Sequence, residues 1–269
     1  MAKPRVALWF AAAAAASGAS DATFGLSQVY RLGIEEAAPP SALASLHFLA
    51  EGDFDPESAA LLRAERAEML SGRFYHGTTT VAFRFDGGTM CCVDSRASLG
   101  SFVGSFATEK AIPVSGRCLG TMAGSAADCS YWLRLLSAVS KLDEMDTGRG
   151  PGAAASADLL SSFLAGQPKD LDLSVGTMLF DADGLCYADS SGTRLAGDLF
   201  AVGSGSAYAY SVLDAGYRTD LSVREAADLA ERAVRTAATR DAFSGGFVNV
   251  YFADRRSGTW RRLRRAATS

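Results

Sequence analysis

Histidine is nearly missing from this chain of 269 residues, which contains only His47 and His76. Because both histidines precede Gly77, the residues that follow cannot form a Ser-His-Asp triad or a Cys-His pair of their own. These residues also contain no GxSxG motif, the usual setting of the nucleophile in α/β-hydrolases. A hydrolase built from them therefore needs a base other than imidazole.

Cysteine is also sparse, and its spacing follows no pattern. The cysteines are odd in number and form no CxxC motif, and they lie at Cys91, Cys92, Cys118, Cys129 and Cys186. This spacing indicates neither a disulfide framework nor a zinc site. We expect free, buried thiols, and we expect no metal and no cofactor.

Long apolar runs and an excess of one charge are absent as well. No stretch reaches the roughly 18 to 20 apolar residues that a membrane-spanning helix needs, and the net charge is −4. The composition therefore favours neither a membrane protein nor a nucleic-acid partner. Lys3 and Arg5 before the apolar run 6–16 loosely fit a secretory signal peptide, but the run is short and mostly alanine, so we do not favour export.

Hydrophobic residues make up 48% of the chain, enough for one sizeable core. Residues 1–77 mix glycine, serine and proline with acidic positions, and we expect a largely flexible segment in which Glu57 to Ser71 forms one helix. At Thr78 the sequence changes abruptly to a strand-like alternation. We therefore predict one domain over residues 78–269.

Blocks of strands and helices follow one another within this domain. The patterns predict a hairpin turning at Gly87-Gly88, a strand at 117–122, helices at 126–142 and 153–164, a hairpin at 173–189, a glycine-rich strand exit at 202–205, helices at 206–216 and 223–240, and strands at 246–252 and around Trp260. Hairpin-joined strands in blocks argue against a parallel, doubly wound sheet. We predict an α+β fold, a four-layer αββα sandwich of two mostly antiparallel sheets.

The Gly77-Thr78 step offers the missing base. A threonine can be activated by its own α-amino group if it is the first residue of the mature chain. The pKa of a free α-amine is about 7.7 to 8.0, so a substantial fraction is neutral at physiological pH and can accept the hydroxyl proton. Three threonines at a strand start otherwise indicate only β propensity.

The surrounding motifs decide between these two interpretations. In order they are HGTTTVAFRF, VDSRAS, the lysine at 110, LGTMAGSAADCSYW, SVGTM, VGSGSAYAY and ATRDAFSGGFVNVY. From His76 to about Phe252 this series resembles the catalytic β subunits of the 20S proteasome, which have the N-terminal nucleophile hydrolase fold. The segment 122–129 is most similar to the chymotrypsin-like subunit type.

The resemblance implies a role for each matched residue. Thr78 would be the nucleophile, exposed by self-cleavage of the Gly77–Thr78 bond, and residues 1–77 would be a propeptide. Lys110 would lie beside the threonine hydroxyl and depress the pKa of the amine, and Asp94 would orient Lys110. An ordinary surface ion pair is the alternative for these last two residues.

Four further residues are assigned supporting roles by the same resemblance. Gly124 would point its backbone N–H at the developing oxyanion, where the lack of a side chain allows close substrate approach. The network around the threonine amine would consist of Ser204, Asp241 and Ser244. Without the resemblance these would be a turn glycine, a loop serine and helix-end residues.

Five residues match positions of the primary substrate pocket, and they are Ala97, Ser98, Thr108, Met122 and Ala126. Small alanines and a flexible methionine would accept bulky apolar side chains, so the resemblance implies cleavage after hydrophobic residues. Thr108 stands where this subunit type usually has valine, which puts the strictness of that preference in doubt. Glu109 replaces a common basic neighbour.

We therefore expect a threonine endopeptidase of intracellular, ubiquitin-dependent protein degradation, in the cytoplasm and nucleus. Its partners would be other β subunits and α rings in a 28-subunit barrel, and its substrates would be polypeptides.

The first alternative is a noncatalytic ring subunit, although the threonine, aspartate and lysine set is complete. A self-processing amidase for small molecules is another. The arginines between 255 and 265 would suit RNA or an acidic partner, but we favour a solvated or subunit-contacting tail.

Overall fold

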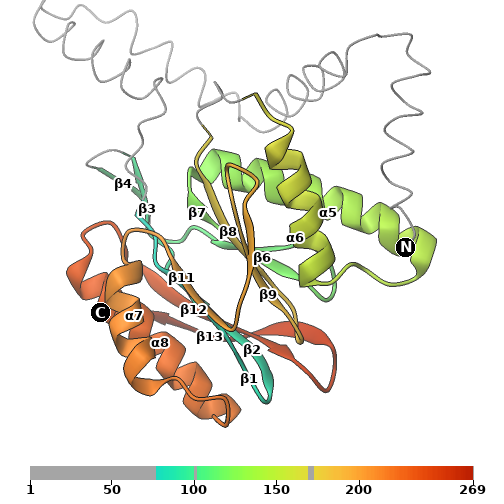
Figure 1. Cartoon of the computed structure of the whole chain (residues 1–269). Coiled ribbons are helices and arrows are strands. Elements are labelled where there is room, and N and C mark those ends of the chain that lie inside the picture. The colour runs from blue at the N-terminus through green and yellow to red at the C-terminus, as the bar shows by residue number, and fades with distance from the viewer. Residues whose placement is uncertain (1–76, 100–101, 169–172, 269) are drawn as a thin grey trace, which may run out of the picture. The chain divides into compact units, whose positions relative to one another are not determined.

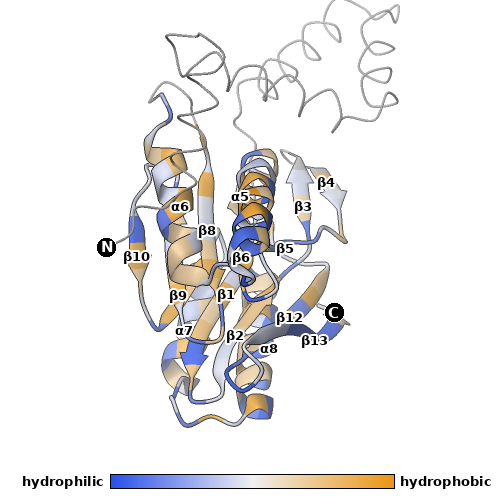
Figure 2. Cartoon of the chain, turned by 90° about the vertical axis from the view of Figure 1, so that its right-hand side faces the viewer, coloured by the Kyte–Doolittle hydropathy of each residue, from blue (hydrophilic) through white to orange (hydrophobic). Residues whose placement is uncertain are grey.

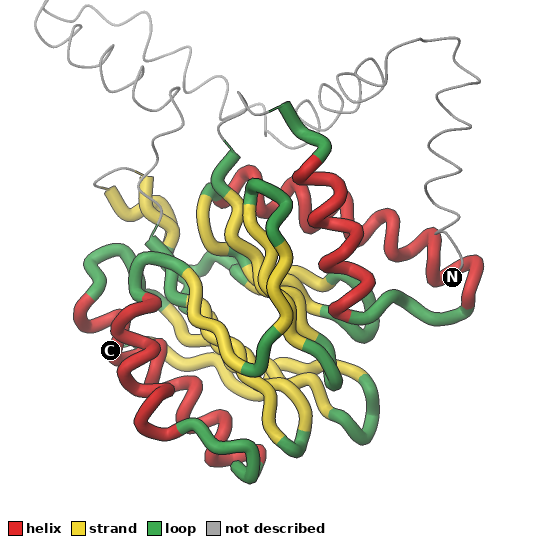
Figure 3. Tube along the Cα trace, in the orientation of Figure 1, coloured by secondary structure: helices red, strands yellow, loops and turns green. Residues whose placement is uncertain are grey.

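The computed structural model describes residues 77–99, 102–168 and 173–268. The helix expected from Glu57 to Ser71 and the rest of the predicted propeptide up to residue 76 lie outside these ranges. In the described part, helices cover the outer faces of the two larger sheets (Figure 1). Figure 3 shows the two layers of strands between the two helix layers. The predicted α+β, αββα architecture is confirmed.

The first sheet has five antiparallel strands in the order β11-β1-β2-β12-β13. The predicted hairpin consists of β1 (Thr80–Phe85) and β2 (Gly88–Val93). β11 (Leu199–Val202) pairs with the free side of β1. β12 (Phe247–Asp254) joins β2 to the edge strand β13 (Thr259–Ala267), the strand predicted around Trp260, which carries most of the arginines of the predicted tail.

The second sheet has the order β10-β9-β8-β6-β5, with β7 paired to β8, and a separate pair is formed by β3 and β4. The strands are β3 (Ala97–Leu99), β4 (Phe102–Ser105), β5 (Ala111–Pro113), β6 (Leu119–Thr121), β7 (Ala123–Gly124), β8 (Val175–Phe180), β9 (Leu185–Asp189) and β10 (Arg194–Ala196). β8 and β9 are the predicted second hairpin. β3, β4, β5, β7 and β10 were not predicted, because two to four residues are too few to show alternation.

Four helices cover the sheets, namely α5 (Ala126–Thr147), α6 (Ala153–Ala165), α7 (Ser206–Gly216) and α8 (Val223–Arg240). α5 begins where the Ser125 hydroxyl accepts the Asp128 N–H and ends at Gly148, whose φ is 74°. It therefore runs past the predicted end at Leu142. α8 begins with a reciprocal capping box between Ser222 and Glu225.

Alternation along the strands divides the core into three parts. Val81 and Phe83 of β1 pack toward α7 and α8, whereas Ala82 between them faces the second sheet. A third cluster joins the second sheet to α5 and α6. Figure 2 shows apolar and polar residues side by side along α5, as expected for a helix with one buried face. All five cysteines are free and buried, as predicted.

In the described part of the chain, no helix combines the length and the apolar character needed to cross a bilayer.

Candidate active site

Strand pairing brings Thr78 beside Asp94. Thr80 of β1 is opposite Val93 of β2, so the residues before β1 lie next to those after β2. The Thr79 N–H donates to Asp94 Oδ1 at 3.0 Å, and the Asp94 N–H donates to the Thr79 carbonyl at 3.1 Å. The antiparallel hairpin alone therefore places the carboxylate at the start of β1.

Lys110 reaches this point from the start of the second sheet, because it directly precedes β5. Its Nζ lies 2.7 Å from Asp94 Oδ1, 3.0 Å from Thr78 Oγ1 and 3.0 Å from the Gly77 carbonyl oxygen. The Thr78 hydroxyl donates to the same carbonyl at 2.7 Å. One ammonium group thus contacts the predicted nucleophile, its carboxylate partner and the predicted scissile bond.

The ion pair is almost completely removed from water. The side chains of Lys110 and Asp94 are 4% and 0% exposed. Burial lowers the pKa of Lys110 and raises the pKa of Asp94, because desolvation disfavours the charged form of each more than their attraction favours it. Backbone N–H groups of Arg96 and Gly245 donate to Asp94 Oδ2 at 3.3 and 2.9 Å, and these hydrogen bonds favour the carboxylate. Lys110 is therefore easier to deprotonate than an ordinary lysine.

A second hydrogen-bonded chain leads away from the Thr78 nitrogen. The Thr78 N–H donates to Ser204 Oγ at 3.2 Å, and the Ser204 hydroxyl donates to Asp241 Oδ2 at 2.5 Å. The Ser244 hydroxyl donates to the same carboxylate oxygen at 2.6 Å and lies 2.7 Å from Thr79 Oγ1. Ser204, Asp241 and Ser244 thus lie in one hydrogen-bonded network that ends at the Thr78 nitrogen.

Glycine is required at Gly203, which follows β11. Its φ is +106°, and a Cβ there would lie 2.1 Å from the Thr78 carbonyl oxygen. The Gly205 N–H donates to that same oxygen at 3.3 Å. The glycine-rich strand exit therefore lets this loop pack directly against the backbone of Thr78.

A cavity of ≈ 350 Å³ opens beside Thr78 and Lys110. All five predicted pocket residues line it, namely Ala97, Ser98, Thr108, Met122 and Ala126, and so does Gly124. Gly124 has a φ of +116°, and a Cβ there would lie 2.4 Å from the Ser174 carbonyl oxygen, so a side chain is excluded. The predicted pocket residues and the predicted nucleophile therefore share one cavity.

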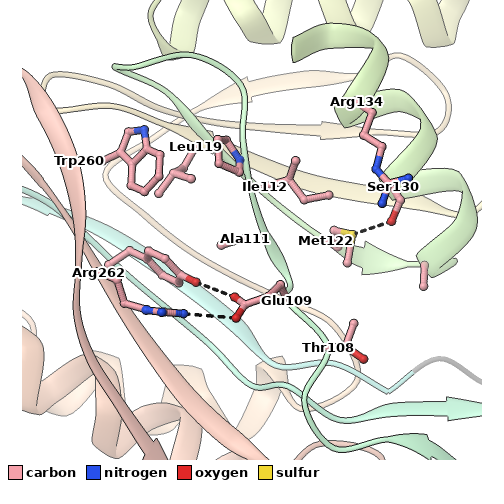
Figure 4. Close-up of a pocket in the computed structure, with 13 residues that line it drawn as sticks. Thr108, Glu109, Ala111, Ile112, Leu119, Met122, Ser130, Arg134, Trp260 and Arg262 are labelled. Carbon is pink, nitrogen blue, oxygen red and sulfur yellow. Dashed lines mark hydrogen bonds and ion pairs between the residues drawn. The ribbon is translucent and has the colours of Figure 1, made fainter. Parts of the chain in front are cut away.

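A larger cavity of ≈ 690 Å³ (Figure 4) adjoins the first and shares Thr108, Met122 and Ala126 with it. The Ser130 hydroxyl donates to Met122 Sδ at 3.2 Å on the shared wall. Neither Thr78 nor Lys110 lines this second cavity.

Comparison with known proteins places these residues in a family. A family model for proteasome subunits matches residues 74–253. The chain belongs to the proteasome subunit family. Because the members of this family are subunits of the proteasome, membership implies assembly with other proteasome subunits.

Individual relatives of this proteasome chain agree with the predicted subunit type. The chain is 48% identical to proteasome subunit beta type-5 of Gallus gallus over 192 residues, which are 70% of this chain and 74% of the relative. It is 47% identical to beta type-8 of Rattus norvegicus over 65% of each chain. The probable beta type-5 of Schizosaccharomyces pombe is 47% identical over 183 residues, 66% of this chain and 67% of the relative. The predicted resemblance to one particular β-subunit type is confirmed, and the relatives name that type as beta type-5.

Sequence reasoning missed two contributors to this proteasome site. Arg96 lines the smaller cavity, and its Nη1 donates to the Ala242 carbonyl at 2.8 Å, beside Asp241. Thr79 links Asp94 to Ser244 through its N–H and its hydroxyl. Both residues lie inside motifs that were already noted, VDSRAS and TTT. Each lies within two residues of a predicted site residue, and this closeness was the available signal.

Proposed function

We propose that this chain is a threonine-type endopeptidase subunit of the 20S proteasome core, with Thr78 as the nucleophile. One observation carries the proposal. Thr78 Oγ1 lies 3.0 Å from the Nζ of a buried lysine that is paired with Asp94, at the wall of a cavity large enough for a side chain. The complete set of Thr78, Asp94 and Lys110 supports a catalytic subunit over a noncatalytic one.

The first reaction is self-cleavage at Gly77–Thr78, which makes residues 1–77 a propeptide. Thr78 Oγ1 attacks the Gly77 carbonyl carbon and passes its proton to Lys110, whose lowered pKa allows the ammonium group to lose a proton beforehand, and the resulting oxyanion is stabilised by hydrogen bonding. The C–N bond then breaks and the Thr78 nitrogen takes the proton, leaving an ester on Oγ1. Water hydrolyses that ester to a Gly77 carboxylate and a free Thr78. The contacts of Lys110 Nζ with both Thr78 Oγ1 and the Gly77 oxygen support this step.

Peptide hydrolysis follows the same course with a substrate carbonyl in place of Gly77. The new α-amine of Thr78 accepts the hydroxyl proton, directly or through a water, and its hydrogen bond to Ser204 orients it. Asp241 and Ser244 hold Ser204 in place, and the cationic Lys110 favours the neutral amine and the alkoxide-like hydroxyl. The Gly124 N–H donates to the developing oxyanion.

The smaller cavity determines the preferred substrate. Its alanines and Met122 suit a hydrophobic side chain before the cleaved bond, and the hydroxyl of Thr108 relaxes that preference. We further propose that the chain works in a 28-subunit barrel of β and α rings, in the cytoplasm and nucleus, on polypeptides destined for ubiquitin-dependent and general degradation. The names of the relatives support the assembly.

The decisive experiment is the N-terminal sequence and intact mass of this subunit from its native assembly. We expect a start at Thr78, and the Thr78→Ala variant, present as the only copy, should keep its leader and hydrolyse no hydrophobic peptide at this subunit. A start near residues 17–20 would instead indicate signal cleavage. If the wild-type subunit keeps its leader and hydrolyses no peptide, it is a noncatalytic subunit.

A further inference from the structure

Glu109, the residue before Lys110, is tied to the last two strands of the first sheet. The Tyr251 hydroxyl of β12 donates to Glu109 Oε2 at 3.1 Å. Arg262 of β13 donates to Oε1 at 3.2 Å (Figure 4), and Arg265 Nη1 lies 3.8 Å from the same oxygen. Two hydrogen-bond donors and one further cation, from two strands, therefore converge on one carboxylate.

The segment that carries Glu109 is held by few backbone contacts, and on the active-site side by the contacts of the Lys110 side chain. Residues 107–110 belong to no helix or strand. Two backbone hydrogen bonds anchor them, from the Thr108 N–H to the Ser95 carbonyl and from the Met122 N–H to the Lys110 carbonyl, both at 2.9 Å. The carboxylate of Glu109 reaches away from Thr78, whereas its neighbour Lys110 reaches toward it. The contacts of Glu109 thus hold the segment from the side opposite to the Lys110 side chain.

An irregularity in β13 decides which arginine reaches Glu109. Val250 is opposite Arg264 and Tyr251 is opposite Arg262, so Leu263 has no partner in β12. In a regular strand Arg262 and Arg264 would project from the same face. The bulge turns Arg262 to the side of Tyr251 and leaves Arg264 on the side of α8, where it contacts Asp228 and Glu231.

The side chains around Glu109, which are Tyr251, Arg262 and Arg265, form a cluster whose members differ in burial. Tyr251 is 4% exposed, whereas the side chains of Glu109 and Arg262 are 51% and 43% exposed. An ion pair this exposed adds little to overall stability. Burial and the adjacent carboxylate raise the pKa of Tyr251, so its hydroxyl remains a donor. The cluster therefore serves to hold the segment 107–110 in place next to the active site, rather than to stabilise the fold.

We propose that Glu109 is a positioning residue for Lys110, held by Tyr251 and Arg262. These contacts keep the segment before β5 in the place where Lys110 Nζ reaches Thr78. The inference rests on the proposed function of Thr78 and Lys110. It also gives the arginine-rich end of the chain a role within the subunit.

A charge swap tests this in assembled particles that carry the chain as the only copy of its subunit. Turnover per active site is measured with a hydrophobic peptide, and the sites are counted by a covalent threonine-directed inhibitor. We expect Glu109→Arg and Arg262→Glu each to lower kcat roughly fivefold to tenfold, the equivalent of a lost charge-assisted contact, with KM nearly unchanged. The double variant Glu109→Arg/Arg262→Glu should recover most of kcat.

Arg264→Glu is the matched control. It makes the same charge change on the same strand at a similar exposure, 37% for the side chain, but it faces α8. We expect its kcat to equal that of the wild type. A kcat loss in Arg264→Glu as large as in Arg262→Glu would assign the effect to strand stability and overturn the inference.

Hydrogen exchange over residues 107–112 in the same particles reads out the segment without using activity. Glu109→Arg should speed this exchange, and the charge swap should restore it. If the wild-type subunit shows no turnover that depends on Thr78, the proposed function is refuted. Faster exchange in Glu109→Arg would still show, in that case, that Glu109 holds the segment in place. Unchanged exchange and unchanged kcat in Glu109→Arg, or a double variant as impaired as the single ones, would overturn the inference.

Discussion

Two charged clusters of this subunit use the same side-chain chemistry in opposite surroundings. Asp94 and Lys110 pair at 2.7 Å with side chains 0% and 4% exposed. Arg264 pairs with Asp228 and Glu231 across the gap between β13 and α8, and the side chains are 37%, 49% and 18% exposed. The first cluster contacts the predicted nucleophile, and the second contacts no residue of the active site.

The difference in exposure changes what an ion pair does. Removing two charges from water costs several kcal/mol for each ion, so a buried pair such as Asp94–Lys110 is poor evidence for stability. Its burial instead shifts both pKa values toward the neutral forms, which suits proton transfer. The Arg264 cluster keeps its water and contributes little beyond holding β13 against α8. The degree of burial thus distinguishes the Asp94–Lys110 pair, which can transfer protons, from the Arg264 cluster, which only joins two elements.

Lys110→Ala should have the largest effect. It removes the group that contacts Thr78 Oγ1 and leaves the Asp94 carboxylate buried without its cation, so propeptide release and peptide turnover should both be lost. The free energy of unfolding should fall by about 3 to 5 kcal/mol, which a folded domain can tolerate. N-terminal sequencing and denaturant unfolding of the variant check both parts. Normal processing in Lys110→Ala would contradict the mechanism.

The double variant Asp94→Asn/Lys110→Met separates the two consequences. Because no unpaired charge remains buried, most of the stability lost in Lys110→Ala should return, to within about 2 kcal/mol of the wild type. Turnover should stay absent, since no group remains to activate Thr78. The same unfolding and processing measurements apply, and a double variant that is less stable than Lys110→Ala would show that the pair stabilises the fold.

Asp241→Asn should have an intermediate effect, because Asp241 is buried but acts on Thr78 only through Ser204. Asparagine keeps the size and an oxygen acceptor but loses the charge that strengthens both serine hydrogen bonds. We expect kcat to fall about tenfold with little change in KM, and processing to continue. Steady-state kinetics with a hydrophobic peptide tests this, and a loss confined to KM would rule out the orienting role.

Arg264→Gln should have the smallest effect. The pair is half exposed, so its loss should cost no more than about 0.5 to 1 kcal/mol. Turnover per site should be unchanged. A destabilisation as large as that of Lys110→Ala, measured in the same denaturant series, would erase the contrast between the two clusters.

Long periodic segments made most of the fold predictable. The helices α7 and α8 lie where alanine and leucine recur at helical spacing, and their predicted bounds agree with the structure. The end of α5 was placed too early because the last residues before Gly148 are polar, although they still form helix up to the glycine. The short strands β3 and β5 were missed because pairing partners, not local pattern, define them.

The catalytic set was identified from motifs, but its geometry was not. The family resemblance named Thr78, Asp94 and Lys110, whereas Arg96 and Thr79 were missed because closeness along the chain to a site residue does not show which way a side chain faces. The role of Glu109 depends on a bulge at Leu263, and no sequence pattern indicated that bulge.

By itself the sequence determined the layers and the absence of a histidine base after Gly77, because composition and periodicity act locally. The candidate nucleophile came from the resemblance of its motifs to a family. Only the tertiary structure decided that Lys110 meets Thr78 and Asp94 without water, and that Arg262 and Arg264 face opposite sides. Contact between residues far apart in the chain depends on strand register and on the depth of burial. Neither strand register nor burial can be predicted from one segment of the sequence alone.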